Sequence, residues 1–168
     1  MGRGLQGGGL RQREVVRGGL IEPLAAVLDA RVLALELFEQ SHDADLLATA
    51  LREANEEVGV MPGQVEVISK LGRAYSLPTQ TIVTPYVGWI DPAANFKPQL
   101  SEIEKIMAVS LNELVSPAVY HSELWTIAGQ SRRVHFFELE EETIWGLTGR
   151  VLWAFLDAIF RDILHIAD

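Results

Sequence analysis

The chain has 168 residues, of which 48% are hydrophobic and 22% are charged, the balance of one folded domain with a sizeable core. It carries a net charge of −9 and no cysteine. The acidic balance argues against unaided binding to nucleic acid or anionic membranes, and the missing cysteines exclude disulfides, thiolate metal sites and a cysteine nucleophile. Charges interrupt the longest apolar stretches and no secretory signal is readable, so we expect no membrane span and a cytoplasmic protein.

The first part of the chain has no regular pattern. Residues 1–19 are rich in glycine and arginine, so we expect a divergent, partly disordered segment over residues 1–41 and a folded domain over 42–168. Leu24–Phe38 is apolar and ambiguous, because its first half suits a helix while Arg31–Phe38 could alternate as a strand.

A helix is predicted next, from about Asp45 to Glu57. Its apolar residues recur at helical spacing, and Asp43 or Asp45 can cap its first turn. Gly59 is a natural helix end, and Met61–Gly63 predicts a turn.

The rest of the chain alternates strand and helix signals. Two β-branched runs predict strands at Gln64–Leu71 and Gln80–Ile90, and Pro85 indicates a bulge or an edge in the second. We then expect a short strand at Ile106–Leu111 and a helical turn at Asn112–Val115. A hairpin over Glu123–Leu139, around the turn Ala128–Ser131, and a long amphipathic helix at Glu142–Ile166 should follow. Strands interleaved with helices predict an α/β fold.

The last helix should bury one face. The residues that we expect to point inward from it are Trp145, Leu152, Phe155, Leu156, Ile159, Phe160 and Ile163. Trp125, Trp145 and Trp153 are interpreted as core residues.

Three carboxylates crowd one face of the helix predicted before Gly59. Glu53, Glu56 and Glu57 lie at i, i+3 and i+4, and Arg52 can pair with Glu56 and fix its orientation. Cations between such side chains would offset their repulsion, and Mg²⁺ or Mn²⁺ are the hard, oxygen-seeking ions that would do so. The spacing alone fits an ordinary charged helix surface equally well.

A longer string decides between these interpretations. Arg52–Val60 reads REANEEVGV and resembles the second half of the Nudix box, G-x5-E-x7-R-E-U-x-E-E-x-G-U, where U is bulky and aliphatic and Ala54 is a small member of that class. Leu46–Glu57, LLATALREANEE, resembles the CoA pyrophosphatase group of Nudix hydrolases. The later strings VEVI, VTPYVG and IWGLT look like that group's later elements, in the same order. The resemblance covers roughly Asp43 to Phe160.

This resemblance implies a Nudix α/β/α sandwich with a mixed β-sheet. It also implies Mg²⁺- or Mn²⁺-dependent hydrolysis of the diphosphate bond in CoA or a CoA derivative, giving 3′,5′-ADP and a phosphopantetheine product. The expected partner is therefore a CoA-like small molecule. The oligomeric state is left open, with a homodimer among the options.

The same resemblance implies the site residues. Carried over by position, the catalytic residues are Arg52, Glu53, Glu56 and Glu57. The metal ligands are Glu53, Glu56, Glu57 and a later loop carboxylate, for which Glu102 aligns best and Glu104 is the close competitor.

The first half of the box departs from the family. Counted back from Arg52, the family's Phe-Pro-Gly-Gly would fall near Ala34–Leu37, where this chain has ALEL. Three explanations stay open: the glycines are lost, they are supplied by Arg17–Pro23 with Leu24–Ser41 as an insertion, or the first forty residues come from another reading frame. The alternatives in function are a catalytically impaired domain that binds a nucleotide or a partner, and a hydrolase for ADP-ribose, NADH or a nucleoside triphosphate.

Overall fold

The computed structural model describes residues 25–28, 32–38, 46–76, 81–91, 93–101 and 106–164. For residues 25–28, 32–38, 81 and 161–164 it describes the backbone alone. Asp43 and Asp45, the expected helix caps, and Glu102 and Glu104, the expected later carboxylates, lie outside the described residues.

Strands and helices alternate along the chain, as the sequence predicts. The elements are β1 (Ala25–Leu28), β2 (Val32–Phe38), α1 (Leu46–Val58), the 3-10 turn η1 (Pro62–Gln64), β3 (Val65–Lys70), β4 (Ala74–Ser76), β5 (Thr81–Ile90), β6 (Ile106–Val109), α2 (Leu111–Leu114), β7 (Tyr120–Ile127), β8 (Gln130–Glu138), β9 (Thr143–Ile144) and α3 (Gly146–Leu164).

The strands form two sheets. Sheet A has the order β3-β5-β2-β1-β6, with β4 also paired to β5, and sheet B has the order β7-β8-β9. In sheet A, β1 runs parallel to β6 and the other pairs are antiparallel. The α/β class and the mixed sheet are therefore confirmed.

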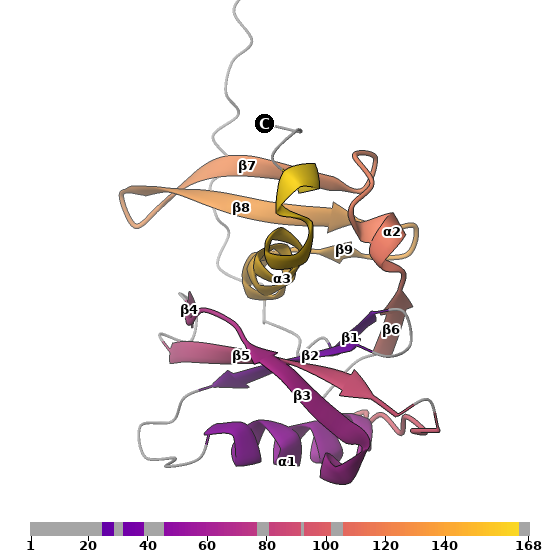
Figure 1. Ribbon diagram of the computed structural model, residues 1–168. Helices are drawn as coiled ribbons and strands as arrows, with labels where there is room; N and C mark the ends of the chain where they lie inside the picture. The colour runs from indigo at the N-terminus through magenta and orange to yellow at the C-terminus, as the bar shows by residue number, and fades with distance from the viewer. Residues whose placement is uncertain are drawn as a thin grey trace, which may run out of the picture.

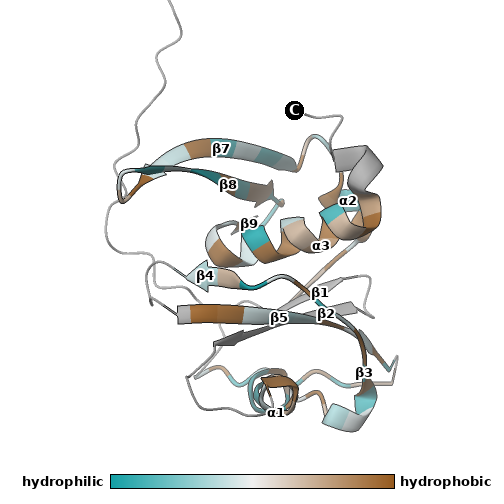
Figure 2. Cartoon of the chain, turned by 60° about the vertical axis from the view of Figure 1, so that its left-hand side comes forward, coloured by the Kyte–Doolittle hydropathy of each residue, from teal (hydrophilic) through white to brown (hydrophobic). Residues whose placement is uncertain are grey.

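The layers follow from the apolar faces of the helices. Figure 1 shows α1 on one side of sheet A and α3 on the other, with sheet B beyond α3. Ala50, Ala54 and Val58 of α1 are buried in one core cluster with Tyr86 and Ile90 of β5. Apolar residues of β5 and α3, brown in Figure 2, contribute to a second cluster on the opposite face. Sheet A thus separates α1 from α3 and from sheet B.

Strand β5, an interior strand of sheet A, corrects the expectation for Pro85. Pro85 does not mark an edge, because β5 has β2 on one side and β3 and β4 on the other. Proline has no N–H to donate to a ladder. It lies where the partner of β5 changes from β3 to β4, and its carbonyl accepts a hydrogen bond from the Leu71 N–H at 2.9 Å. The register shift in β3 falls elsewhere, between Val67 and Ser69.

The apolar segment Leu24–Phe38 also differs from expectation in its first half. Ala25–Leu28 is a strand instead of a helix, because it pairs with β6, about eighty residues later, as well as with β2. The second half forms β2, the predicted strand, whose seven residues pair with β5. Periodicity cannot distinguish a short buried strand from a buried helix, and here the distant partner decides.

The structure around α3 corrects the expected burial of two side chains. Trp145 is 48% exposed and Ile159 is 47% exposed, so neither is core. Trp145 precedes the first residue of α3, so the helical period does not apply to it. Ile159 lies beside Phe160, whose non-helical backbone breaks the phase of the apolar stripe. Within the described residues, no helix is long and apolar enough to cross a membrane.

Candidate functional site

The predicted glutamates lie on the solvent side of α1. Glu56 is 52% exposed, Glu53 is 31% exposed, and Glu57 is half-buried. The opposite side of the helix is fixed on sheet A by Ala50, Ala54 and Val58. Burial of this small-residue stripe therefore determines which way the carboxylates face, as the i, i+3, i+4 spacing predicts.

Arg52 connects two of the three carboxylates. Its Nη1 lies 2.5 Å from Oε2 of Glu56, and its Nη2 lies 3.5 Å from Oε1 of Glu53. The i, i+4 pair with Glu56 agrees with the expected pairing. These side chains are exposed, so such a pair stabilises a helix by about 0.3–0.5 kcal/mol. Its main effect is orientation, because one guanidinium holds two carboxylates on the same side of α1.

The C-terminal end of α1 is held by the loop of residues 93–99. The backbone N–H of Lys97 donates to the carbonyl of Val58 at 2.9 Å, and that of Gln99 donates to the carbonyl of Glu57 at 2.8 Å. The last carbonyls of a helix have no partner within the helix, so the 93–99 loop satisfies two of them. The sequence patterns did not predict this loop as part of the site.

Gly59 permits this close approach. Its φ is +75°, and a Cβ built on it would lie 2.9 Å from Cβ and 3.1 Å from N of Lys97. The glycine of the REANEEVGV string therefore has two structural functions: it ends the helix in a left-handed conformation and it leaves room for the loop. That glycine was the one signal in the sequence for a second segment against α1.

The donor chemistry of this face fits a hard divalent cation. Carboxylate oxygens are the ligands that Mg²⁺ and Mn²⁺ prefer, and three of them project from one turn of one helix. In their present rotamers, no group of three His, Cys, Asp or Glu side chains in the described residues is placed to hold a metal ion. Because Glu53 and Glu56 are partly or largely exposed, their side chains can turn toward a shared cation.

Comparison with known proteins gives the family. No protein-family model matches the chain. It is 36% identical over 110 residues to the Nudix hydrolase NudL of Photorhabdus laumondii, covering 66% of this chain and 58% of that protein. It is 37% identical over 112 residues to NudL of Citrobacter koseri, covering 67% and 58%.

A third relative is the peroxisomal coenzyme A diphosphatase NUDT7 of Mus musculus, 39% identical over 99 residues, which cover 59% of this chain and 42% of that protein. The chain thus spans about half the length of the curated relatives that it matches. The α/β/α arrangement of sheet A between α1 and α3, with its mixed strand order, is the fold that the REANEEVGV string implies. Over the region that these relatives share with it, the chain belongs to the Nudix hydrolase family.

Proposed function

We propose that the protein is a metal-dependent pyrophosphohydrolase that cleaves the diphosphate bond of CoA or a CoA derivative, giving 3′,5′-ADP and a phosphopantetheine product. The observation that carries this proposal is the carboxylate face of α1, with Glu53 and Glu56 linked by Arg52. The CoA diphosphatase among the relatives supports the choice of substrate. A cytoplasmic location stays a prediction from the sequence.

The proposed roles follow from the positions on α1. Glu53, Glu56 and Glu57 would hold Mg²⁺ or Mn²⁺, and the bound ion would supply an activated water and charge neutralisation at the leaving phosphate. Arg52 would keep the carboxylates of Glu53 and Glu56 on one side of the helix, at the distances already given. The packed Ala50–Ala54–Val58 stripe would keep the helix itself from rotating.

A later carboxylate completes the proposed ligand set. Gln99, bonded to the Glu57 carbonyl, lies three positions before Glu102 and five before Glu104. Three residues span at most about 11 Å and five about 18 Å, so the 93–99 loop delivers the chain to the end of α1 just before both glutamates. Both tethers allow this approach, and we propose Glu102, the better aligned of the two, as the fourth ligand.

One observation favours the impaired-domain alternative. The positions where the family has Phe-Pro-Gly-Gly fall at Ala34–Leu37, which lie inside β2 and pair with β5 from Val87 to Thr84. A continuous antiparallel ladder there is a different backbone from a glycine loop beside the box helix. If that loop is required for turnover, the domain would bind its nucleotide without cleaving it.

The test is a substrate panel. The purified chain is incubated separately with CoA, ADP-ribose and NADH in Mg²⁺ or Mn²⁺, with a chelator in parallel, and the products are separated by chromatography. Metal-dependent 3′,5′-ADP from CoA, with slower cleavage of the other two, is the expected result. Faster cleavage of ADP-ribose or NADH would identify that compound, and not CoA, as the substrate. If none of the three is cleaved, the result would favour the catalytically impaired domain.

A further inference from the structure

The outer face of sheet B carries a group of partly exposed aromatic rings. Successive residues of a strand point to opposite faces. On the inner face His135 is buried, and its ring stacks on Trp153 of α3 at 4.4 Å. His121 and Phe136 are directly paired across β7 and β8 and belong to the opposite, outer face. We call His121, Trp125, Phe136 and Trp145 the aromatic platform.

The rings of the platform are ordered against one another. Phe136 stacks on His121 at 5.0 Å with a 5° interplanar angle, and on Trp145 at 6.1 Å with a 9° angle. Trp125 lies tilted beside them, 5.7 Å from Phe136 and 5.9 Å from Trp145. Trp145 nevertheless remains 48% exposed. A row of parallel rings with one large ring open to solvent can accept a further flat group by stacking.

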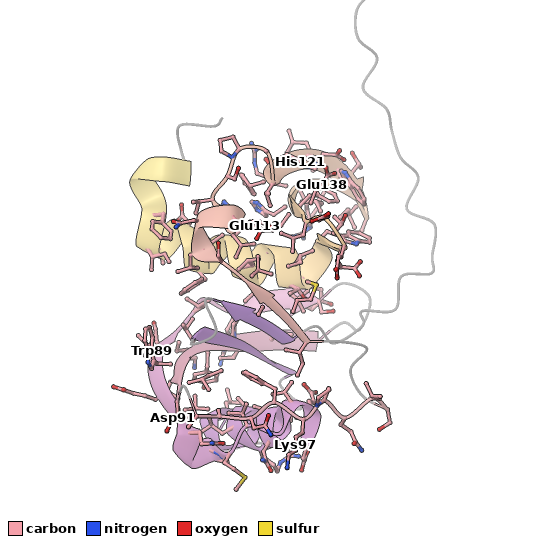
Figure 3. All side chains as sticks on the ribbon, turned by 90° about the vertical axis from the view of Figure 1, so that its right-hand side faces the viewer. Trp89, Asp91, Lys97, Glu113, His121 and Glu138 are labelled. Atoms are coloured by element: carbon pink, nitrogen blue, oxygen red, sulfur yellow. The ribbon has the colours of Figure 1, made fainter. Side chains whose placement is uncertain are left out.

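The platform is separate from the carboxylate face of α1. In Figure 3, His121 and Glu138 lie at the opposite end of the molecule from Asp91 and Lys97, which flank α1. Sheet A and α3 lie between sheet B and α1, as Figure 1 shows. A ligand bound at the platform would therefore be separate from the carboxylate face and independent of the proposed hydrolysis.

Two carboxylates lie at the platform, beside one cation, Arg132, which is directly paired with Trp125 and belongs to the same face. Oε1 of Glu123 lies 3.9 Å from Nε2 of His121, and Oε1 of Glu138 lies 4.0 Å from its Nδ1. Oε2 of Glu123 accepts a hydrogen bond from the indole of Trp125 at 2.6 Å. Three further glutamates, at positions 140–142, are exposed just before β9. Aromatic faces and carboxylates both attract cations, and a planar guanidinium can stack and form hydrogen bonds at once.

We propose that residues 1–24 of this chain dock on the aromatic platform through their arginines. These residues contain Arg3, Arg11, Arg13 and Arg17 with only two glutamates, so they carry +2, whereas the rest of the chain carries −11. They are thus the basic part of an acidic protein, and the carboxylates of Glu123 and Glu138 at the platform have the complementary charge. The occupant is a segment of this chain, bound in cis.

The segment is long enough to reach the platform. Thirteen residues separate Arg11 from Leu24, which spans about 45 Å when extended. A folded chain of this length has a radius of gyration of about 15 Å and an overall radius of about 20 Å, so the path over its surface to the opposite face is about 60 Å. Arg11 reaches most of that path, and Arg3, twenty-one positions before Leu24, reaches about 70 Å and therefore any face. The segment enters the fold at Ala25, which pairs with Ile106 at the start of β6.

The test observes the indole N–H signals of the full chain by NMR, since two of the four tryptophans, Trp125 and Trp145, belong to the platform and the other two, Trp89 and Trp153, lie outside it. The variant Arg11→Gln/Arg13→Gln/Arg17→Gln is compared with the wild type. We expect the Trp125 and Trp145 signals to move while those of Trp89 and Trp153 stay. Raising the salt to 1 M, where the Debye length is about 3 Å, should move the wild-type signals toward those of the variant.

A matched control removes the same charge elsewhere. Lys70→Gln/Arg73→Gln/Lys97→Gln takes three cations from described, exposed positions outside the platform and should leave Trp125 and Trp145 unmoved. Glu138→Gln, which removes a carboxylate beside His121, should reproduce part of the shift. Three results would overturn the proposal: equal signals in wild type and arginine variant, an equal shift in the control, or a shift that grows with protein concentration, which would indicate a second copy.

Discussion

Gly59→Ala adds one methyl group at the point where α1 ends against the 93–99 loop. The new Cβ would lie 2.9 Å from Cβ, 3.1 Å from N and 3.2 Å from O of Lys97, and the backbone φ of +75° is one that alanine rarely adopts. Two of the three close atoms belong to backbone whose N–H is already bonded to the Val58 carbonyl. The loop therefore cannot yield without losing that hydrogen bond.

The expected cost has two parts. A left-handed conformation costs a non-glycine residue about 1–2 kcal/mol, and overpacking against fixed atoms costs about 1–3 kcal/mol. Alanine also lowers the conformational entropy of the unfolded chain, which offsets about 0.4–1 kcal/mol of this cost. The net loss in the free energy of unfolding is about 1–4.5 kcal/mol, or a fall in Tm of about 2–18 °C for a chain of this size.

Two other glycines separate these parts in urea unfolding. Gly129→Ala meets no atom within 4 Å but has a φ of +76°, so it should show the conformational cost alone. Gly63→Ala meets neither obstacle and should be neutral or slightly stabilising. If Gly59→Ala costs no more than Gly129→Ala, the contact with Lys97 contributes nothing and Gly59 is not needed for the approach of the 93–99 loop.

Three further outcomes are expected. Gly149→Ala should lower the midpoint of urea unfolding, because the new Cβ would lie 2.6 Å from the carbonyl oxygen of His135. This clash should outweigh the helix propensity of alanine, which exceeds that of glycine by about 1 kcal/mol, and a raised midpoint would contradict the packing. Arg52→Gln should change the free energy of unfolding by less than about 1 kcal/mol, since its pairs are exposed, and a larger loss would assign Arg52 a structural role. Chelation should abolish product release and excess Mn²⁺ should restore it, whereas release that persists in chelator would exclude metal dependence.

Local signals predicted the elements that local chemistry determines. The stripe that begins at Leu47 and the glycine at position 59 give α1 within one residue at each end. The hairpin predicted around Ala128–Ser131 is present, but its turn is only Ala128 and Gly129, both with positive φ, and Gln130 and Ser131 already belong to β8. The face of α1 that carries the glutamates follows from the same stripe.

The remaining features depend on contacts between distant segments. Ala25–Leu28 is a strand because β6 lies beside it, and nothing within those four residues indicates this. Trp145 is a large apolar residue of the kind expected in a core, but it packs on Trp125 and Phe136 on the outer face of sheet B. The approach of Lys97 to Gly59 likewise joins segments nearly forty positions apart. Spacing on one element places side chains on a face, and only the fold shows what lies opposite.

The most direct test of the account is the rate of 3′,5′-ADP release from CoA in Mn²⁺ by the wild type, Glu56→Gln and Glu113→Gln. Glu113 is an exposed glutamate on α2, away from the carboxylate face, and serves as the matched control. We predict that Glu56→Gln lowers the rate by roughly 100-fold or more, as for loss of a catalytic carboxylate, and that Glu113→Gln leaves it unchanged. Equal rates in all three proteins would contradict the assignment of the site to α1.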